Sequence, residues 1–135
     1  MHHPWRAFRA LSHIRLRWAV LPEGLYGYTD HELGEVVIAQ GLTQAERRCT
    51  IAHETQHALR GPVPAYLRTR EEERVDRDAA RLLLPDIGDV AEAMAWSLSV
   101  EEAADELWVD ADTLRCRLRH LHPSERGYLH RRLSD

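Results

Sequence analysis

The fold is decided by residues 43–85, which read TQAERRCTIAHETQHALRGPVPAYLRTREEERVDRDAARLLLP. Thr43, followed three residues later by Glu46, is a capping-box signal that predicts the start of a helix. Gly61 and the proline after it predict the end of that helix. A second helix is expected over about residues 69–84, because a proline closes it. Two helices joined by a short loop therefore form the centre of the chain.

The residues before this segment have strand character. Residues 13–21 alternate apolar side chains with arginines, which is the period-2 pattern of a half-buried strand. Residues 25–29 and 35–40 are two further strand candidates, and the last contains three consecutive β-branched residues. A short amphipathic helix is expected over residues 4–11. Turn residues separate the three strands, so a small antiparallel three-stranded sheet is predicted.

The residues after the central segment are expected to be helical. Capping signals at Ser99 and Asp110 predict helices that end near residues 107 and 121. A sheet followed by helices indicates an α+β fold. With 135 residues, the chain fits one domain, residues 1–135, in which about 87–135 form a helical C-terminal extension packed on the rest.

Composition narrows the classes of function. The net charge of −4 argues against a domain that is generally attracted to nucleic acid. No apolar run approaches the roughly 18 residues needed to cross a bilayer, and the N-terminus lacks the features of a signal peptide. A cytoplasmic protein without a membrane partner is therefore predicted. Cys49 and Cys116 form no paired motif, and we expect two reduced, packed thiols.

The first central helix carries the motif His53-Glu54-Thr55-Gln56-His57. Positions four apart differ by only about 40° around a helix axis, so His53 and His57 project from one face. Two imidazoles one turn apart can bind one Zn²⁺, and Glu54 can reach a water on that metal. The spacing predicts a zinc site with Glu54 as general base.

The third metal ligand is expected from the acidic start of the second central helix, where Glu71, Glu72 and Glu73 follow one another. Glu72 and Asp76 share one stripe of that helix with two apolar residues, which makes Glu72 the best-placed ligand. Glu71 and Glu73 stay as alternatives. Asp76 can accept a hydrogen bond from the free N–H of a ligand histidine and so fix its tautomer.

These motifs resemble those of the ImmA/IrrE metallo-endopeptidase family over roughly residues 35–121. The second motif of that family typically reads Glu-x-x-Ala-Asn/Asp-x-Phe-Ala-x-x-Leu-Leu-Met-Pro. This chain has Glu72-x-x-Val75-Asp76, followed by Ala79-Ala80-Arg81-Leu82-Leu83-Leu84-Pro85. Val75 and Asp78 stand where the family has alanine and phenylalanine, and the connection between the two motifs is short.

The resemblance implies a gluzincin-like peptidase with a zincin-like active-site helix, of a kind often carried by phages and mobile elements. It implies one Zn²⁺ per chain, held by His53, His57 and Glu72, with Glu54 catalytic. Some members of the family cleave a repressor. The implied substrate is therefore a protein or peptide partner such as a repressor or an antitoxin.

Two features of a peptidase need further residues. A developing oxyanion needs a donor besides the metal, and the sequence offers Tyr66, His122 and Tyr128 without distinguishing among them. An extended peptide could add to the edge of the sheet near residues 35–40 through main-chain hydrogen bonds.

Other functions are open at this point. The C-terminal helices resemble a helix-turn-helix, in which Arg115, Arg117 and Arg119 would face DNA. Against this, the turn lacks a glycine and the first of the two helices is acidic. A protein-interaction module with a structural metal and no proteolysis is a further alternative. Binding of nucleic acid is the less favoured hypothesis.

Overall fold

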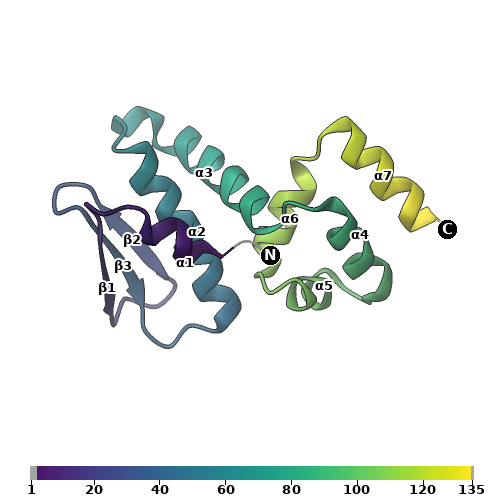
Figure 1. Ribbon diagram of the computed structural model, residues 1–135, viewed down its shortest axis with the longest axis horizontal. Coiled ribbons are helices and arrows are strands. Elements are labelled where there is room, and N and C mark those ends of the chain that lie inside the picture. Colours follow the sequence, from purple (N-terminus) through teal and green to yellow (C-terminus); the bar gives the residue numbers. More distant parts are fainter. Residues whose placement is uncertain (1–2, 135) are drawn as a thin grey trace.

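The computed structural model describes residues 3–134. In chain order the elements are α1 (Pro4–Arg9), β1 (Arg15–Ala19), β2 (Gly27–Asp30), β3 (Glu35–Ala39), α2 (Gln44–Arg60), the 3₁₀ helix η1 (Ala65–Leu67), α3 (Arg68–Leu83), α4 (Ile87–Trp96), α5 (Val100–Glu106), α6 (Ala111–Arg119) and α7 (Pro123–Ser134). The sheet lies at one end of the molecule with α1 and α2 beside it, and α4 to α7 form the other end (Figure 1). The predicted α+β fold is confirmed.

The sheet is mixed, so the prediction of an antiparallel sheet was wrong. The strand order is β1-β3-β2, with β2 antiparallel and β1 parallel to β3. All five residues of β3 are buried, whereas β1 and β2 are partly exposed. The most apolar strand therefore takes the middle position, where neighbours cover it on both sides. Since β1 and β2 run in opposite directions, only β2 can be antiparallel to the strand between them.

The first two elements are shorter than the sequence pattern predicts. The helix expected over residues 4–11 ends at Arg9, and the strand expected over residues 13–21 spans Arg15–Ala19. Val20 lies beyond that strand and is 85% exposed. The apolar alternation thus extends past the residues that pair with β3.

The two central helices begin and end close to the predicted residues. The Thr43 side chain accepts a hydrogen bond from the backbone N–H of Glu46 (3.1 Å), and the Glu46 carboxylate accepts one from the backbone N–H of Thr43 (2.8 Å). This capping box satisfies two N–H groups that α2 would otherwise leave unpaired. Gly61 ends α2 with a φ of 80°, a conformation that favours glycine.

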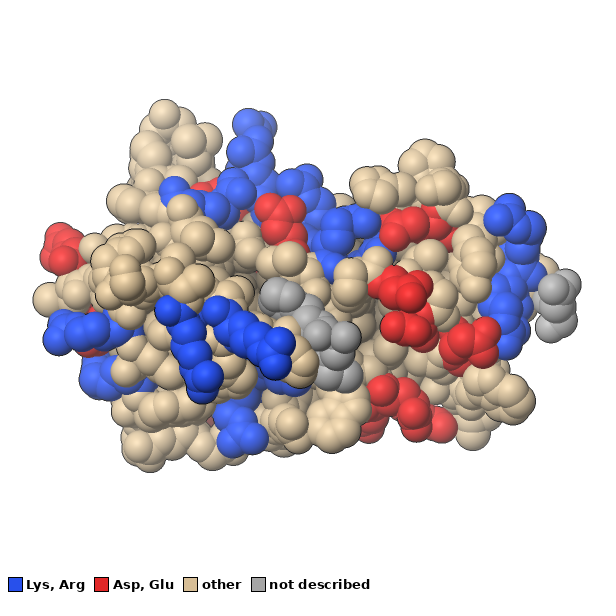
Figure 2. Space-filling view, in the orientation of Figure 1, with Lys and Arg blue, Asp and Glu red and all other residues tan. Residues whose placement is uncertain are grey.

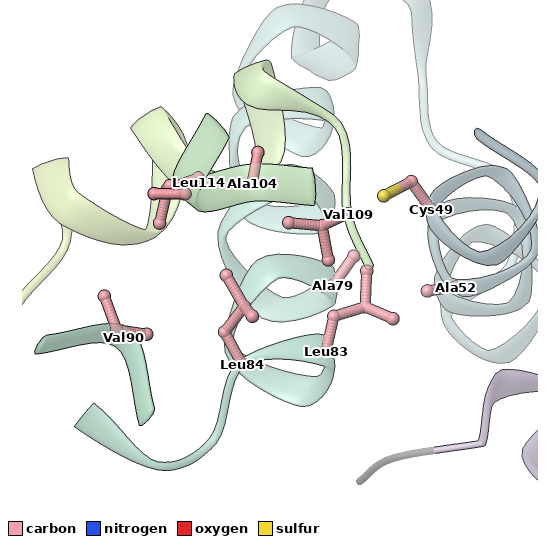
Figure 3. Packing of buried hydrophobic residues seen from close by; sticks show 10 residues of the cluster. Cys49, Ala52, Ala79, Leu83, Leu84, Val90, Ala104, Val109 and Leu114 are labelled. Carbon is pink, nitrogen blue, oxygen red and sulfur yellow. The ribbon is translucent and has the colours of Figure 1, made fainter. Parts of the chain in front are cut away.

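Two apolar clusters hold the molecule together. One joins the sheet to α1 and α2 and contains Phe8, Val36, Ile38 and Ile51. The other runs from α2 through α3 to the C-terminal helices, and its buried residues are Cys49, Ala52, Ala79, Leu83, Leu84, Val90, Ala103, Ala104, Val109 and Leu114 (Figure 3). The C-terminal helices therefore pack on α3 through an apolar core.

The C-terminal part contains two helices, α4 and α7, that the capping signals did not predict. The Asp86 side chain caps α4 by accepting a hydrogen bond from the backbone N–H of Gly88 (2.7 Å). The α7 helix packs against α4, where Arg132 donates to Glu92 at 2.8 Å. Among residues 3–134, no helix combines the length and the apolar character needed to cross a bilayer.

The arginines of α6 are engaged within the chain. Arg117 is 1% exposed, and its guanidinium donates to the carbonyl oxygen of Leu84 (2.8 Å) and to the Glu125 carboxylate (2.5 Å). Arg115 forms ion pairs with Glu101 (2.5 Å) and Asp112 (3.3 Å). Two of the three arginines in the DNA-binding hypothesis are therefore committed to internal ion pairs, which argues against that hypothesis.

Gly27 lets β2 approach α2 closely. A Cβ at this position would lie 2.7 Å from Cγ2 of Thr50 and 2.8 Å from the carbonyl oxygen of Val37. Gly27→Ala should therefore lower the free energy of unfolding by about 1–3 kcal/mol, as overpacking of a core does. Urea unfolding measures this change.

Gly127→Ala is the matched control. The added Cβ there would meet only the far end of the flexible Arg131 side chain, and alanine is the better residue inside a helix. Equal effects of the two substitutions would contradict the close approach of β2 to α2.

Candidate metal centre

His53 and His57 lie one turn apart on α2 and meet the start of α3. Their Nε2 atoms are 3.2 Å apart. The Glu72 carboxylate lies against both, with 2.8 Å between Oε1 and Nε2 of His57 and 3.1 Å between Oε2 and Nε2 of His53. Three potential ligand atoms from two helices therefore converge on one point.

This group fits a metal ion. Of the described residues, His53, His57 and Glu72 form a set whose ligand atoms all lie within 4.8 Å of one another. In a tetrahedral zinc site with metal–ligand distances of about 2.0–2.1 Å, neighbouring ligand atoms lie about 3.3 Å apart, close to the separations found here. Two imidazoles and one carboxylate are also the donor types of catalytic zinc sites.

The neighbouring glutamates of α3 point elsewhere. Glu71 is buried and accepts hydrogen bonds from the Arg60 guanidinium at 2.7 and 2.9 Å, which holds the pKa of Glu71 below its usual range. Glu73 is exposed. Of the three consecutive glutamates, Glu72 is therefore the one whose carboxylate lies against the two histidines.

Asp76 contacts the outer nitrogen of His53. Its Oδ1 lies 2.9 Å from Nδ1 of His53, where it can accept the ring N–H and leave Nε2 free to bind a metal. Burial lowers the pKa of His53, but the hydrogen bond to Asp76 and the charges of Glu54, Asp76 and Glu72 together raise it. The same carboxylates favour a metal cation at this position.

Glu54 is buried beside the two histidines, with 5% of its surface exposed. Burial raises the pKa of Glu54, because it disfavours the charged carboxylate, while the charge of His53 and a hydrogen bond from Thr29 oppose the rise. The Thr29 hydroxyl donates to Oε2 of Glu54 at 2.8 Å and lies 3.2 Å from the Glu54 carbonyl oxygen. Thr29 on β2 thus fixes the direction of this carboxylate.

Two hollows flank this group of residues. A cavity of about 490 Å³ extends towards α6 and is lined by Tyr26, Asp110 and Arg119 among others. A second cavity, of about 540 Å³, extends towards the loop after α2. Gly27, His53 and Glu54 line both. The group therefore lies at the middle of a continuous depression.

The proposed oxyanion donors lie away from this depression. Tyr66 is 84% exposed on η1, and the Tyr128 hydroxyl lies near Gly88 in the C-terminal part. His122 is exposed, and its backbone N–H donates a hydrogen bond to the Glu125 carboxylate. None of the three lines either cavity.

Other residues with donor groups line the depression instead. Tyr26 lines the first cavity, and Tyr28 and His31 line the second. All three come from β2 or its ends, and Thr29 lies on the same strand. The pairing of β2 with β3 brings these three residues close to α2. Their spacing in the sequence does not indicate that they lie near the metal group.

The sheet edge beside the site is β2, which corrects the expectation of an edge at residues 35–40. Those residues form β3, which is paired on both sides. No strand among residues 3–134 pairs with the outer edge of β2, and β2 supplies Gly27 and Thr29 to the surroundings of Glu54. An extended peptide that adds to this sheet beside the site would pair with β2.

The two cysteines are free and buried, as predicted. Both line the first cavity. Burial raises the pKa of Cys49 to about 11, and it also raises the pKa of Cys116. Neither thiol is therefore ionised near neutral pH, so the site is not built for a cysteine nucleophile.

The chain was compared with known protein families, curated proteins and solved structures. A family model described as the IrrE N-terminal-like domain, from a peptidase family, matches residues 19–119. The chain belongs to this family. The match covers the sheet from the end of β1, both central helices and the chain as far as the end of α6. It confirms the resemblance to ImmA/IrrE proteins seen in the two motifs. Neither the curated proteins nor the solved structures contain a match to this chain.

Proposed function

We propose that the protein is a zinc-dependent endopeptidase in which His53, His57 and Glu72 hold the metal and Glu54 is the general base. The observation that carries this proposal is the convergence of Nε2 of both histidines and the Glu72 carboxylate within 3.2 Å, beside a buried glutamate. Membership of a peptidase family supports the same reaction.

A catalytic role for the metal is favoured over a structural one. Structural zinc sites are closed by four protein ligands, whereas catalytic sites use three and keep one position open. Among residues 3–134, three such groups converge here, and two cavities open beside them. This arrangement argues against the alternative of an interaction module with a structural metal.

The residues of the site have separate tasks in this proposal. A bound Zn²⁺ supplies Lewis-acid polarisation of the scissile carbonyl and makes the attacking water more acidic. Glu54 accepts the proton of that water and passes it to the leaving amine. Thr29 holds the Glu54 carboxylate in place, and Asp76 holds the ring of His53. Tyr26, Tyr28 and His31 replace Tyr66, His122 and Tyr128 as candidates for the oxyanion donor.

We further propose a protein substrate that binds as an extended strand along the outer edge of β2. Main-chain hydrogen bonds to an unpaired strand edge provide affinity that does not depend on sequence, and the two cavities would receive side chains on either side of the cleaved bond. The family resemblance suggests a repressor or an antitoxin as the natural partner in the cytoplasm.

Chelation tests the proposed reaction. The zinc-loaded protein should cleave members of a peptide mixture from a digested bacterial proteome, as detected by mass spectrometry of new termini. Treatment with EDTA should abolish cleavage, and Zn²⁺ should restore it, because the proposed reaction needs the metal. Cleavage that survives chelation, or a zinc-loaded protein that cleaves nothing in the mixture, would contradict the proposal.

A further inference from the structure

Negative charge is concentrated in one part of the sequence. Residues 86–112 contain nine aspartates and glutamates and no lysine, arginine or histidine, although the whole chain has a net charge of only −4. The rest of the chain is therefore net positive. On the face shown in Figure 2, acidic side chains gather over α4 and α5. The acidic residues of α4 and α5 lie outside the metal site, whereas Asp110 and Asp112 line the first cavity beside it.

A groove of about 670 Å³ lies between the end of α3 and the helices α4 and α5. Five acidic residues line it, namely Asp86, Asp89, Glu92, Glu102 and Glu106, and no basic residue does. Leucines at the end of α3, together with Trp96 and Leu107, supply apolar surface in the same groove. The groove thus combines an apolar surface with a negative rim.

Two apolar side chains near the groove are highly exposed, although Leu83 and Leu84 within it are buried. Trp96 is 80% exposed and Leu98, two residues further on, is 96% exposed. A tryptophan contributes the largest apolar area of any side chain, and exposed aromatic residues on a polar-rimmed surface are typical of interaction sites. Trp96 lies outside both apolar clusters of the described chain.

Part of the negative charge has no ion-pair partner among residues 3–134. Asp86 caps α4, Glu102 accepts a hydrogen bond from the backbone N–H of Leu98, and Glu92 pairs with Arg132. Asp89 and Glu106 are exposed and form no ion pair with any residue between 3 and 134. Their charges are available to a binding partner.

We propose that this groove is a docking site for a basic amphipathic segment of a partner protein. Apolar side chains of the segment would pack on Trp96 and Leu107, and its arginines or lysines would face Asp89 and Glu106. Charge complementarity selects this occupant, since the acidic rim repels nucleic acid and acidic proteins. Leu83 lines both this groove and the cavity beside His53.

Peptide binding tests the proposal without any need for catalysis. The probe is a fluorescein-labelled 18-residue peptide of leucines and arginines arranged with one apolar face. The protein carries Glu54→Gln, so that the peptide is not cleaved. Anisotropy should report saturable binding at low salt, and Trp96→Ala should weaken it at least about tenfold, as the loss of an aromatic anchor does. Asp89→Asn combined with Glu106→Gln should weaken it as well and reduce its salt dependence.

Matched controls separate the groove from general charge attraction. Leu33→Ala and Glu32→Gln remove an exposed apolar and an exposed acidic side chain from the turn before β3, and both should leave the affinity unchanged. A scrambled peptide of the same composition without an apolar face should bind at least about tenfold more weakly. The proposal is overturned if the scrambled peptide binds equally well, or if the groove variants bind like the parent protein. It is also overturned if sedimentation shows a dimer of this chain that Trp96→Ala dissolves, because the occupant would then be a second copy.

Discussion

Glu54→Gln should reduce peptide hydrolysis by about 10²–10⁴-fold, because it removes the group that takes the proton of the attacking water. The substituted amide keeps the size of the side chain and can still pair with the Thr29 hydroxyl. We therefore expect the variant to keep its fold and its bound metal. Initial rates of cleavage of a quenched fluorescent peptide measure the activity. Metal content and circular dichroism, recorded on the same samples, measure metal binding and folding.

Glu73→Gln is the matched control for this variant. Glu73 lies on α3 next to Glu72 but is exposed, and it is not among the residues that line the two cavities of the site. Its rate should equal that of the unchanged protein. A Glu54→Gln variant that keeps its metal and more than about a tenth of the activity would show that another group acts as the base.

Arg117→Ala should lower the free energy of unfolding by about 3–5 kcal/mol, because it removes a buried guanidinium together with its hydrogen bonds to the Leu84 carbonyl oxygen and to the partly buried Glu125 carboxylate. Arg117 is 1% exposed and joins α6 both to the end of α3 and to α7. Urea unfolding followed by circular dichroism measures the loss. Arg115→Ala is the control, since Arg115 forms exposed ion pairs and its loss should cost less than about 1 kcal/mol. Equal losses of unfolding free energy in Arg117→Ala and Arg115→Ala would contradict a stabilising role for the buried contacts of Arg117.

Acid should weaken the ion pair between Arg117 and Glu125. The Arg117 guanidinium and the backbone N–H of His122 lower the pKa of Glu125 to about 2, well below the usual range of a glutamate. A carboxylate with a lowered pKa contributes its stability above the unfolded-state pKa and loses it as the pH falls through the folded-state pKa. The contribution of Glu125 should thus be full above about pH 5 and decline towards pH 2. The stability of Glu125→Gln should depend less on pH over this range.

The helices around the site could be predicted because their signals are local. Thr43 and Glu46 are three residues apart and cap α2 as expected, and Gly61 ends it. The strand order could not be predicted in the same way. It depends on which strand is most completely buried, and β3 takes the middle of the sheet for that reason. The helices α4 and α7 were also missed, although Asp86 is a local cap for α4, and the two helices pack against each other.

Helical geometry was enough to predict which residues of the candidate metal site share a helix face. His53 and His57 are one turn apart on α2, and Glu72 and Asp76 are one turn apart on α3, so each pair shares a helix face. Thr29 contacts Glu54 across 25 positions of sequence, and only the sheet pairing brings them together. Residue type alone selected Tyr66, His122 and Tyr128 as oxyanion candidates, and none of the three lines either cavity beside Glu54.

The central claim is that His53, His57 and Glu72 hold one zinc ion, and elemental mass spectrometry of the purified, zinc-reconstituted protein tests it most directly. The unchanged protein and Glu73→Ala should each contain about one zinc per chain, while His57→Ala and Glu72→Ala should contain almost none because three protein ligands are needed. Circular dichroism establishes that the variants are folded. Zinc retained in both ligand variants, or no zinc in the unchanged protein, would contradict the account.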